Sequence, residues 1–257
     1  MLTHRTNIFL LSSLLLISAF LIRAYNLSFG ILFLPLLIFL IIEIIGASRL
    51  SANFHFKSIC SFQTTEKVVS ITFDDGPHGG ATEKVLSVLK EFNVTSTFFC
   101  IGNKINGDIS LVKKMSDAGH IIANHSYTHG NLFNLQPTNK LIEELELANK
   151  TIKGTIGKTP LFFRPPYGVA TPAIGRAIQQ TNMISVGWNI RSFDTSIKNP
   201  EIIFQKIKPQ IKPGSIILLH DRVEGCDVVV RLLLNHLKNN NYTVVNLDKL
   251  INKPAYA

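Results

Sequence analysis

An alternation of two kinds of segment, which begins at about residue 66, limits the possible folds more than any other feature of this sequence. Short runs rich in β-branched and aromatic residues predict strands, and the amphipathic stretches between them predict helices. The predicted strands are VVSITFDD from Val68, STFFCIG from Ser96, HIIANHS from His120, LFFRPP from Leu161, MISVGWNI from Met183, SIILLHD from Ser215 and YTVVNL from Tyr242. Strands that alternate with helices form parallel sheets, either doubly wound or closed into a barrel. We predict an α/β fold of the β/α barrel type.

Two apolar runs precede this region, IFLLSSLLLISAFLI over residues 8–22 and ILFLPLLIFLIIEIIG over residues 31–46. With its flank from Leu27, the second run reaches the ~20 residues that cross a bilayer, whereas the shorter first run also resembles the apolar core of a signal peptide. A soluble domain rarely spends so many consecutive residues on buried core helices. The sequence therefore predicts an N-terminal transmembrane helical hairpin, with one or two spanning helices and membrane lipid as a partner.

The charges around the apolar runs bear on orientation. If both runs span, the chain ends share one side. The basic residues there, Arg5, Arg49 and Lys57, outnumber Arg23 in the turn and favour a cytoplasmic location for the domain that follows. If only the second run spans, or the first is cleaved, the domain can face outward. We expect a protein of the bacterial inner membrane, with the side of the domain left open. Glu43 in the second run is costly unless it is paired or near the interface, and the sequence gives it no role.

These patterns divide the chain into a membrane anchor (1–50), a connector (51–65) and an α/β domain (66–252), which holds the candidate site residues considered next. The formal charge of +9 would suit nucleic acid, but the lysines are scattered, without a dense basic run or interleaved aromatic residues. We therefore expect no nucleic-acid partner, and no protein partner is predicted. Cys60, Cys100 and Cys226 are widely spaced without a CxxC pair, so no disulfide framework follows.

Polar and titratable residues gather at the C-terminal ends of the predicted strands. These residues are Asp74, Asp75, His125, Arg164, Asp194 and His220. In β/α barrels the active site lies at that end of the strands. The pattern therefore favours a catalytic site over a purely structural role.

The sequences DDGP and HSYTH together suggest a metal site. Alone, DDGP is typical of a plain turn, and a single HxxxH is a weak signal. On a helical turn, however, His125 and His129 would present both imidazoles on one face. With Asp75 they would form a set of two imidazoles and one carboxylate, which leaves positions open for water and substrate on one divalent ion. Asp74, kept ionised beside the cation, would act as a base.

Two further residues fit roles around this set. Arg164, in FFRPPYG, is either a surface arginine over a turn or the partner that holds Asp74 and keeps it deprotonated. His220 is either a core imidazole or a general acid whose tautomer is held by Asp194.

In order along the chain, TFDDGP, HSYTH, RPPYG and LLH resemble the motifs of the polysaccharide deacetylases, the family 4 carbohydrate esterases with the NodB homology domain. The resemblance covers about residues 66–250. It implies a distorted β/α barrel of seven strands, and one divalent metal ion, zinc or else cobalt or another ion. It also implies that the backbone amide of Tyr167 stabilises the oxyanion, that His220 protonates the leaving amine, and that Leu218 lines the pocket for the acyl methyl group.

One motif departs from the family pattern. Where an aspartate, two residues and Asp-Trp are usual, this chain has Arg191-Ser192-Phe193-Asp194-Thr195. Asp194 can still orient His220, but the usual carboxylate contact to Arg164 and the aromatic wall of the acyl pocket are placed in doubt. Trp188 or Phe193 would supply that wall. Arg191 either meets an anionic group of the substrate, or points into solvent or pairs with a local carboxylate.

We therefore predict a hydrolase of carbon–nitrogen bonds in linear amides other than peptide bonds. It would remove an N-acetyl group from an N-acetylated amino sugar of a cell-envelope or lipid-linked glycan. Metal-bound water would be the nucleophile, an aspartate the base and a histidine the acid. Two alternatives remain: a deformylase or deacetylase of a polyprenyl-phosphate-linked sugar, and a catalytically silent sugar-binding barrel.

Overall fold

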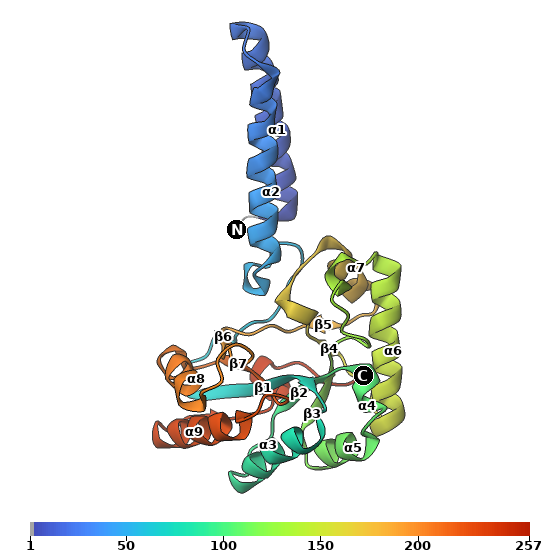
Figure 1. Ribbon diagram of the computed structural model, residues 1–257, viewed down its shortest axis with the longest axis vertical. Helices are drawn as coiled ribbons and strands as arrows, with labels where there is room; N and C mark the ends of the chain where they lie inside the picture. The colour runs from blue at the N-terminus through green and yellow to red at the C-terminus, as the bar shows by residue number, and fades with distance from the viewer. Residues whose placement is uncertain (1–2) are drawn as a thin grey trace.

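The computed structural model describes residues 3–257 as an apolar helical hairpin that projects from an α/β domain (Figure 1). The hairpin consists of α1 (His4–Tyr25), a short 3₁₀ turn η1 (Phe29–Leu32) and α2 (Phe33–Ala47). Thr3 caps α1, because its hydroxyl accepts a hydrogen bond from the amide of Thr6. Asn26, in the left-handed conformation, ends the helix and begins the turn.

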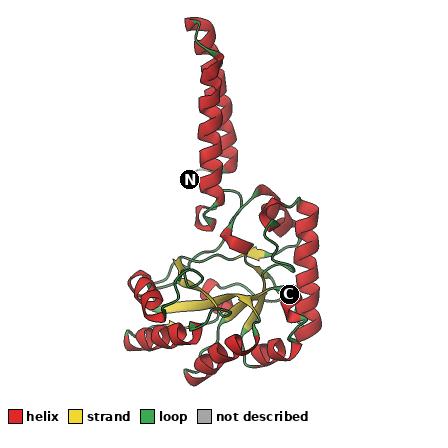
Figure 2. Cartoon of the chain, in the orientation of Figure 1, coloured by secondary structure: helices red, strands yellow, loops and turns green. Residues whose placement is uncertain are grey.

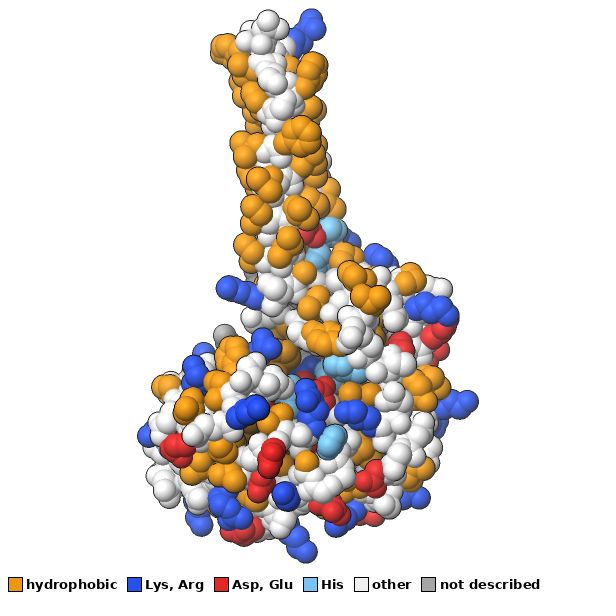
Figure 3. Space-filling model, in the orientation of Figure 1, with side chains coloured by type: hydrophobic (Ala, Val, Ile, Leu, Met, Phe, Trp, Pro, Cys, Tyr) orange, Lys and Arg blue, Asp and Glu red, His pale blue; other side chains and the backbone are white. Residues whose placement is uncertain are grey.

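Apolar side chains cover the hairpin over most of its length (Figure 3). His4–Tyr25 and Phe29–Ala47 span 22 and 19 residues, long enough to cross a bilayer, and only 6% and 11% of their most apolar windows are buried. The two runs are thus not core helices of the domain. Their length and exposure are compatible with a membrane anchor or with a signal sequence.

The hairpin ends directly on the domain. The carbonyl of Ala47 accepts a hydrogen bond of 2.8 Å from the amide of Ala170, and the carbonyl of Phe54 accepts one of 3.0 Å from the amide of His4. The next short turn, η2 (Leu50–Ala52), buries Leu50 against Cys60 and Ala170. The connector that follows also joins the sheet, because Ile59 forms a parallel bridge with Val186.

Seven parallel strands form the distorted, incompletely closed barrel, which confirms the predicted fold class. They are β1 (Val68–Gly76), β2 (Thr97–Cys100), β3 (Ile121–Asn124), β4 (Phe162–Phe163), β5 (Ile184–Ser185), β6 (Ile190–Arg191) and β7 (Ile216–His220), hydrogen-bonded in the order β5-β4-β3-β2-β1-β7-β6. The strands therefore follow chain order around the barrel, with the seam between β5 and β6. An eighth strand, β8 (Thr243–Val244), pairs with the start of β1.

The seventh barrel strand was assigned wrongly from the sequence. MISVGWNI, predicted as one strand, is split into β5 and β6, whereas the run at Tyr242 forms β8 outside the barrel order. A contact from elsewhere in the chain accompanies the split: the carbonyls of Val186 and Gly187, between the two strands, accept hydrogen bonds from the Arg164 side chain instead of from a neighbouring strand. Periodicity in the sequence does not reveal such a contact.

Helices surround the sheet (Figure 2). They are α3 (Gly79–Glu91), α4 (Gly102–Ile105), α5 (Ile109–Asp117), α6 (Thr138–Ile156), α7 (Pro172–Gln180), α8 (Pro200–Ile207), α9 (Cys226–Asn239) and α10 (Leu247–Ile251), with short 3₁₀ turns η3 (Phe133–Leu135), η4 (Pro166–Gly168) and η5 (Lys208–Gln210). Pro172 and Pro200 occupy first helical positions, where their missing amide hydrogens cost nothing, and Thr171 and Asn199 cap the same helices.

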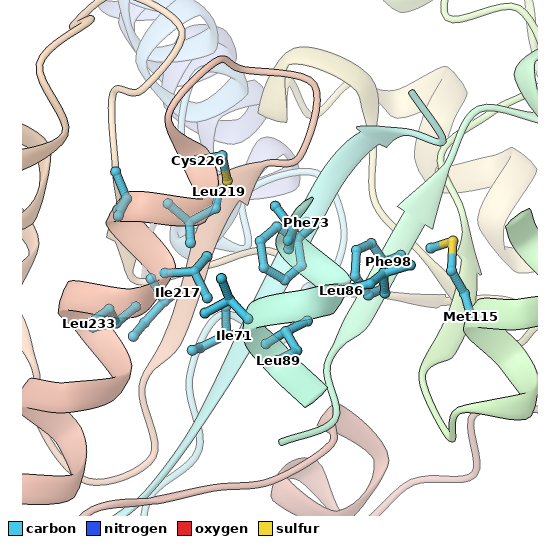
Figure 4. Packing of buried hydrophobic residues seen from close by; sticks show 14 of the residues in the cluster. Ile71, Phe73, Leu86, Leu89, Phe98, Met115, Ile217, Leu219, Cys226 and Leu233 are labelled. Carbon is cyan, nitrogen blue, oxygen red and sulfur yellow. The ribbon is translucent and has the colours of Figure 1, made fainter. Parts of the chain in front are cut away.

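Side-chain alternation along the central strands separates the core from the site. Ile71 and Phe73 of β1, with Ile217 and Leu219 of β7, face the helices and pack against residues such as Leu89 of α3 (Figure 4). The residues between them in β1 and β7 are Thr72 and Asp74 in register with Leu218 and His220. Because successive strand residues point to opposite faces, these four side chains point into the barrel.

Candidate active site

A cavity of about 190 Å³ lies at the C-terminal ends of the strands. Asp74, Asp75, His125, His129, Tyr167, Gly168, Trp188, Arg191, Thr195, Leu218, His220 and Arg222 line it. Acidic, basic and histidine side chains gather in a hollow of the domain surface below the hairpin (Figure 3). All ten predicted site residues therefore meet here, since the remaining two, Arg164 and Asp194, hydrogen-bond to the lining residues Asp74 and His220.

Arg164 is fully buried and positions Asp74. Its Nη1 donates to Asp74 Oδ1 at 2.7 Å and to Thr72 Oγ1 at 2.9 Å. Its Nε and Nη2 donate to the carbonyls of Val186 and Gly187, and the guanidinium lies 4.0 Å from the centre of the Phe99 ring. These contacts resolve the doubt raised by Arg191: a hydroxyl and two carbonyls satisfy Arg164 without a second carboxylate.

Asp75, His125 and His129 bring three ligand atoms together. Oδ1 of Asp75 lies 3.5 Å from Nε2 of His125 and 3.4 Å from Nε2 of His129. Two nitrogens and one carboxylate oxygen at this spacing suit a divalent ion such as zinc, since ligand atoms ~2.0–2.1 Å from a tetrahedral zinc lie roughly 3.3 Å apart. His125 Nδ1 donates to the carbonyl of Arg164 at 2.7 Å, so the lone pair of Nε2 is directed at the site.

The segment that supplies both histidines is a loop, so the expectation of a helical turn is wrong. Ser126 and His129 have φ of 64° and 53°, in the left-handed region. Glu144 of α6 holds the loop: its carboxylate accepts hydrogen bonds from the amides of Tyr127 and Thr128, at 3.0 and 2.8 Å, and from the Thr128 hydroxyl at 2.8 Å. The two imidazoles converge because of this anchoring and not because of helical spacing.

The ionisation of the ligands suits a cation. Burial alone would raise the pKa of Asp75, but hydrogen bonding and charge from His125 and the guanidinium of Arg222 hold that pKa well below its usual range. Burial, together with the charge of His125, lowers the pKa of His129 to about 4. At neutral pH the site therefore presents a carboxylate and a neutral imidazole, the forms that bind metal.

His220, at the end of β7, is oriented by Asp194. The Asp194 carboxylate accepts hydrogen bonds of 2.7 Å from both His220 Nδ1 and the His220 backbone amide. Burial would lower the pKa of His220, but the hydrogen bond and charge of Asp194 outweigh it and the pKa is raised. Because Nδ1 is engaged, Nε2 is the nitrogen that can give a proton to a group in the cavity.

The loop that follows β4 forms another wall. Tyr167 has φ 62° within η4, and its hydroxyl donates to the carbonyl of His129 at 3.2 Å. A Cβ atom on Gly168 would lie 2.5 Å from the Trp188 ring, so glycine allows the indole to pack against this loop. Of the two aromatic residues proposed for the acyl wall, Trp188 lines the cavity, whereas Phe193 lines an adjacent groove.

Besides Thr72 and Glu144, three polar residues around the site were not predicted from the sequence. Arg222 Nε donates to Asp75 Oδ2 at 2.8 Å, and Lys104 Nζ donates to the Asp75 carbonyl at 2.9 Å. Asp221 is fully buried, its Oδ2 accepts a hydrogen bond of 2.6 Å from Thr82, and burial raises its pKa to about 6. The sequence HDR at the end of β7 was a signal for Arg222 and Asp221; none pointed to Lys104.

Comparisons with known proteins agree with this geometry. A family model described as polysaccharide deacetylase matches residues 62–186. The chain is 34% identical over 196 residues to the peptidoglycan-N-acetylmuramic acid deacetylase PdaA of Bacillus subtilis, a match that covers 73% of each chain. It is 30% identical over 186 residues to the peptidoglycan-N-acetylglucosamine deacetylase PgdA of Listeria monocytogenes, of which it covers 39%.

A solved structure shows the same fold. The Bc1960 peptidoglycan N-acetylglucosamine deacetylase superposes with a TM-score of 0.73 at 27% sequence identity. The superposition covers 78% of this chain and 95% of that one.

Proposed function

The chain belongs to the polysaccharide deacetylase family, and on that basis we propose that it removes the N-acetyl group from an N-acetylated amino sugar of a cell-envelope glycan. It would thus be a hydrolase of carbon–nitrogen bonds in linear amides. One observation carries the proposal: a single cavity joins the cluster of Asp75, His125 and His129 to a carboxylate held by arginine and an imidazole held by aspartate.

A divalent ion bound by Asp75, His125 and His129, which we expect to be zinc although cobalt or another ion would suit the same ligands, would act as a Lewis acid and lower the pKa of water toward ~7. Asp74, fixed by Arg164, accepts the proton of the attacking water. The carboxylate does not need to move for this step, because three further acceptors, the Thr72 hydroxyl and the carbonyls of Val186 and Gly187, hold the arginine in place.

The remaining residues act on the substrate. The backbone amide of Tyr167 donates to the carbonyl oxygen as negative charge develops on it, a contact whose loss commonly costs on the order of 3 kcal/mol of transition-state stabilisation. His220 then protonates the leaving nitrogen, and Asp194 stabilises the imidazolium. Leu218 and Trp188 border the space for the acyl methyl group.

Two substitutions test the division of roles. We expect Asp75→Ala to lose both metal binding and acetate release from N-acetylated oligosaccharides, because it removes a ligand. We expect Asp74→Asn to keep the metal and lose turnover by about 10²–10⁴-fold, the usual contribution of a general base. Metal content by mass spectrometry and acetate release are measured on the same samples. Full activity of Asp74→Asn would exclude Asp74 as the base.

The same assay addresses the alternative of a catalytically silent sugar-binding barrel. That alternative predicts that wild-type protein binds N-acetylated oligosaccharides without releasing acetate. Calorimetric titration together with an acetate assay separates the deacetylase from the silent sugar-binding barrel. An active enzyme releases acetate from the oligosaccharide during the titration, whereas a silent barrel binds it unchanged.

A lipid-linked, phosphate-bearing sugar is the second candidate substrate, and one observation favours it. A groove of about 410 Å³ runs from the cavity to the end of the hairpin and shares Tyr167, Gly168, Trp188 and Arg191 with it. Its lining also includes Arg49, next to the hairpin. Two guanidinium groups between the site and the proposed membrane surface would suit a phosphate that joins a lipid to a sugar.

Charge removal tests this candidate. We expect the double substitution Arg49→Ala, Arg191→Ala to lower kcat/KM for a polyprenyl-phosphate-linked N-acyl sugar at least tenfold and to leave a neutral N-acetylated oligosaccharide unaffected. Arg176→Ala, at an arginine on α7 outside both linings, is the control. Equal losses on both substrates would assign the arginines a structural role. Comparison of kcat/KM for the N-formyl and N-acetyl forms of the lipid-linked sugar identifies the acyl group that the enzyme removes.

A further inference from the structure

A second group of two imidazoles and one carboxylate lies away from the catalytic cavity, where the hairpin meets the domain. His4 begins α1, Glu43 lies near the end of α2, and His55 follows η2. One ligand atom of each lies within 4.8 Å of the others. Histidine and acidic side chains are visible together at this end of the hairpin (Figure 3).

The spacing of these atoms resembles that of the catalytic set. Glu43 Oε2 lies 3.1 Å from His4 Nδ1 and 3.7 Å from His55 Nε2. These values lie on either side of the separation of roughly 3.3 Å between ligand atoms of a tetrahedral zinc ion. A small movement of the Glu43 side chain would equalise them.

The surroundings of Glu43 are built to hold its carboxylate. Asn7 is fully buried, and its amide group donates to Glu43 Oε1 at 2.8 Å and to the carbonyl of Phe39 at 3.3 Å. A hydrogen-bonded carboxylate whose orientation is fixed by a buried neighbour is typical of metal sites.

His55 has no polar partner that would explain its burial. Its side chain is 2% exposed, and its Nδ1 is buried without a hydrogen-bond partner among residues 3–257. Its Nε2 stands 3.7 Å from the carboxylate, beyond hydrogen-bonding distance. With the proton on Nδ1, the lone pair of Nε2 is free to bind a cation beside the carboxylate.

We propose that His4, Glu43 and His55 bind a second divalent metal ion, of the zinc class. Two imidazoles and a carboxylate are borderline ligands that suit this class. The ion would join three segments that are far apart in the sequence: the start of α1, the end of α2 and the connector to the barrel. Glu43, an acidic residue within an apolar run, would then act as a metal ligand at the end of the hairpin.

Metal stoichiometry of the full-length chain in detergent tests the proposal. After loading with zinc and dialysis, we expect two zinc ions per wild-type chain, one in Glu43→Gln, one in Asp75→Ala and none in the double variant. Glu66→Gln, at an exposed glutamate just after the connector, is the matched control and should keep two. One zinc in wild type and none in Asp75→Ala would overturn the site formed by His4, Glu43 and His55, here called the junction site. The same result would leave the catalytic metal site in place.

A second measurement does not depend on how well Glu43→Gln folds. In the Asp75→Ala background, where only the junction site remains, zinc should raise Tm in a concentration-dependent manner, because an ion bound only by the native state stabilises it. Zinc should not raise Tm of the Asp75→Ala, His55→Gln double variant. A zinc-independent Tm in Asp75→Ala itself would show that the cluster is only hydrogen-bonded and would overturn the proposal.

Discussion

At the residue scale, the contact between Asp194 and His220 should set the pH range of activity. His220 must be protonated to act as an acid, and Asp194 raises its pKa above the ordinary value of 6.5. Activity should therefore fall as pH rises through this raised pKa. In Asp194→Asn, only the charges of Asp74 and Asp75 still oppose burial, so the pKa of His220 falls and the alkaline limb of kcat/KM moves to lower pH. We expect kcat to be reduced about 10²-fold or more.

A pH profile from pH 5 to 9 measures this shift. Asp117→Asn, at an exposed aspartate at the end of α5, provides the control and should keep the wild-type limb. An unchanged limb in Asp194→Asn would assign the alkaline limb to a group other than His220.

Asp221 should affect stability as well. Its pKa is about 6 in the folded protein against 3.8 for an ordinary aspartate, so the folded state holds its proton more tightly. Stability is then lost as pH rises from about 4 to about 6 and stays reduced above that range. Asp221→Asn removes this loss, on the order of 3 kcal/mol at most, since one pKa unit corresponds to about 1.4 kcal/mol.

Thermal unfolding of metal-free protein checks the prediction. The Tm advantage of Asp221→Asn over wild type should grow between pH 4 and pH 6 and remain constant above. An advantage that does not change with pH would mean that the substitution acts through packing and not through the buried charge.

At the scale of elements, site residues could be predicted from the sequence where they form motifs at the ends of predicted strands. Asp74, His125, Arg164 and His220 were identified because their motifs follow apolar runs, and the structure brings them into one cavity. Glu144 was not predicted as a site residue because it lies in the middle of a helix, where a glutamate is common. Only the fold brings it to the loop that carries His125 and His129. Long-range contacts of this kind leave no periodic signal.

The same reasoning explains the error in the strands. A run such as MISVGWNI has the β-branched and aromatic content of a strand, and nothing local shows that Arg164 takes two of its carbonyls. The sequence likewise did not show whether Arg164 keeps enough hydrogen-bond partners when Arg191 replaces the aspartate that is usual in the family motif. Only the surroundings of Arg164 show that hydroxyl and carbonyl groups complete its contacts.

Glu144 gives a prediction at this scale. Glu144→Ala leaves the amides of Tyr127 and Thr128 without their acceptor, so the loop that carries His125 and His129 loses its anchor. We expect metal affinity at the catalytic site to fall about 10–100-fold, the usual effect of removing a group that orients ligands. Calorimetric zinc titration measures this.

The control is Glu146→Ala, at an exposed glutamate two residues along the same helix. A loss of affinity in both variants would point to a general effect on α6, and no loss in Glu144→Ala would show that the loop holds its shape unaided.

At the scale of the whole molecule, we propose that residues 1–50 form a membrane anchor on the domain that follows. We expect the full-length chain to sediment with membranes, to resist carbonate and to be released by detergent. Replacing Leu14 and Leu37 with arginine should reduce the membrane-bound fraction, since each charge at a helix centre costs about 2.5–3.5 kcal/mol on insertion scales. Conservative Leu→Ile changes at both positions serve as controls.

The mass of the mature protein separates an anchor from a cleaved signal sequence. An intact N-terminus is expected, and a shortened chain in the soluble fraction would contradict the anchor. A reporter fused to the C-terminus then shows on which side of the membrane the domain lies, and therefore whether it can meet a wall polymer or only a lipid-linked precursor.

The hydrogen bond from Ala170 to Ala47 ties the end of the hairpin to the loop that follows Tyr167, a residue of the cavity wall. If the hairpin spans the bilayer, the catalytic cavity stands at one fixed height above the lipid. The enzyme would then search for substrate by lateral diffusion in two dimensions, at the high local concentration that tethering provides. Sugars at that height would be within reach, and identical sugars farther along a glycan strand would not.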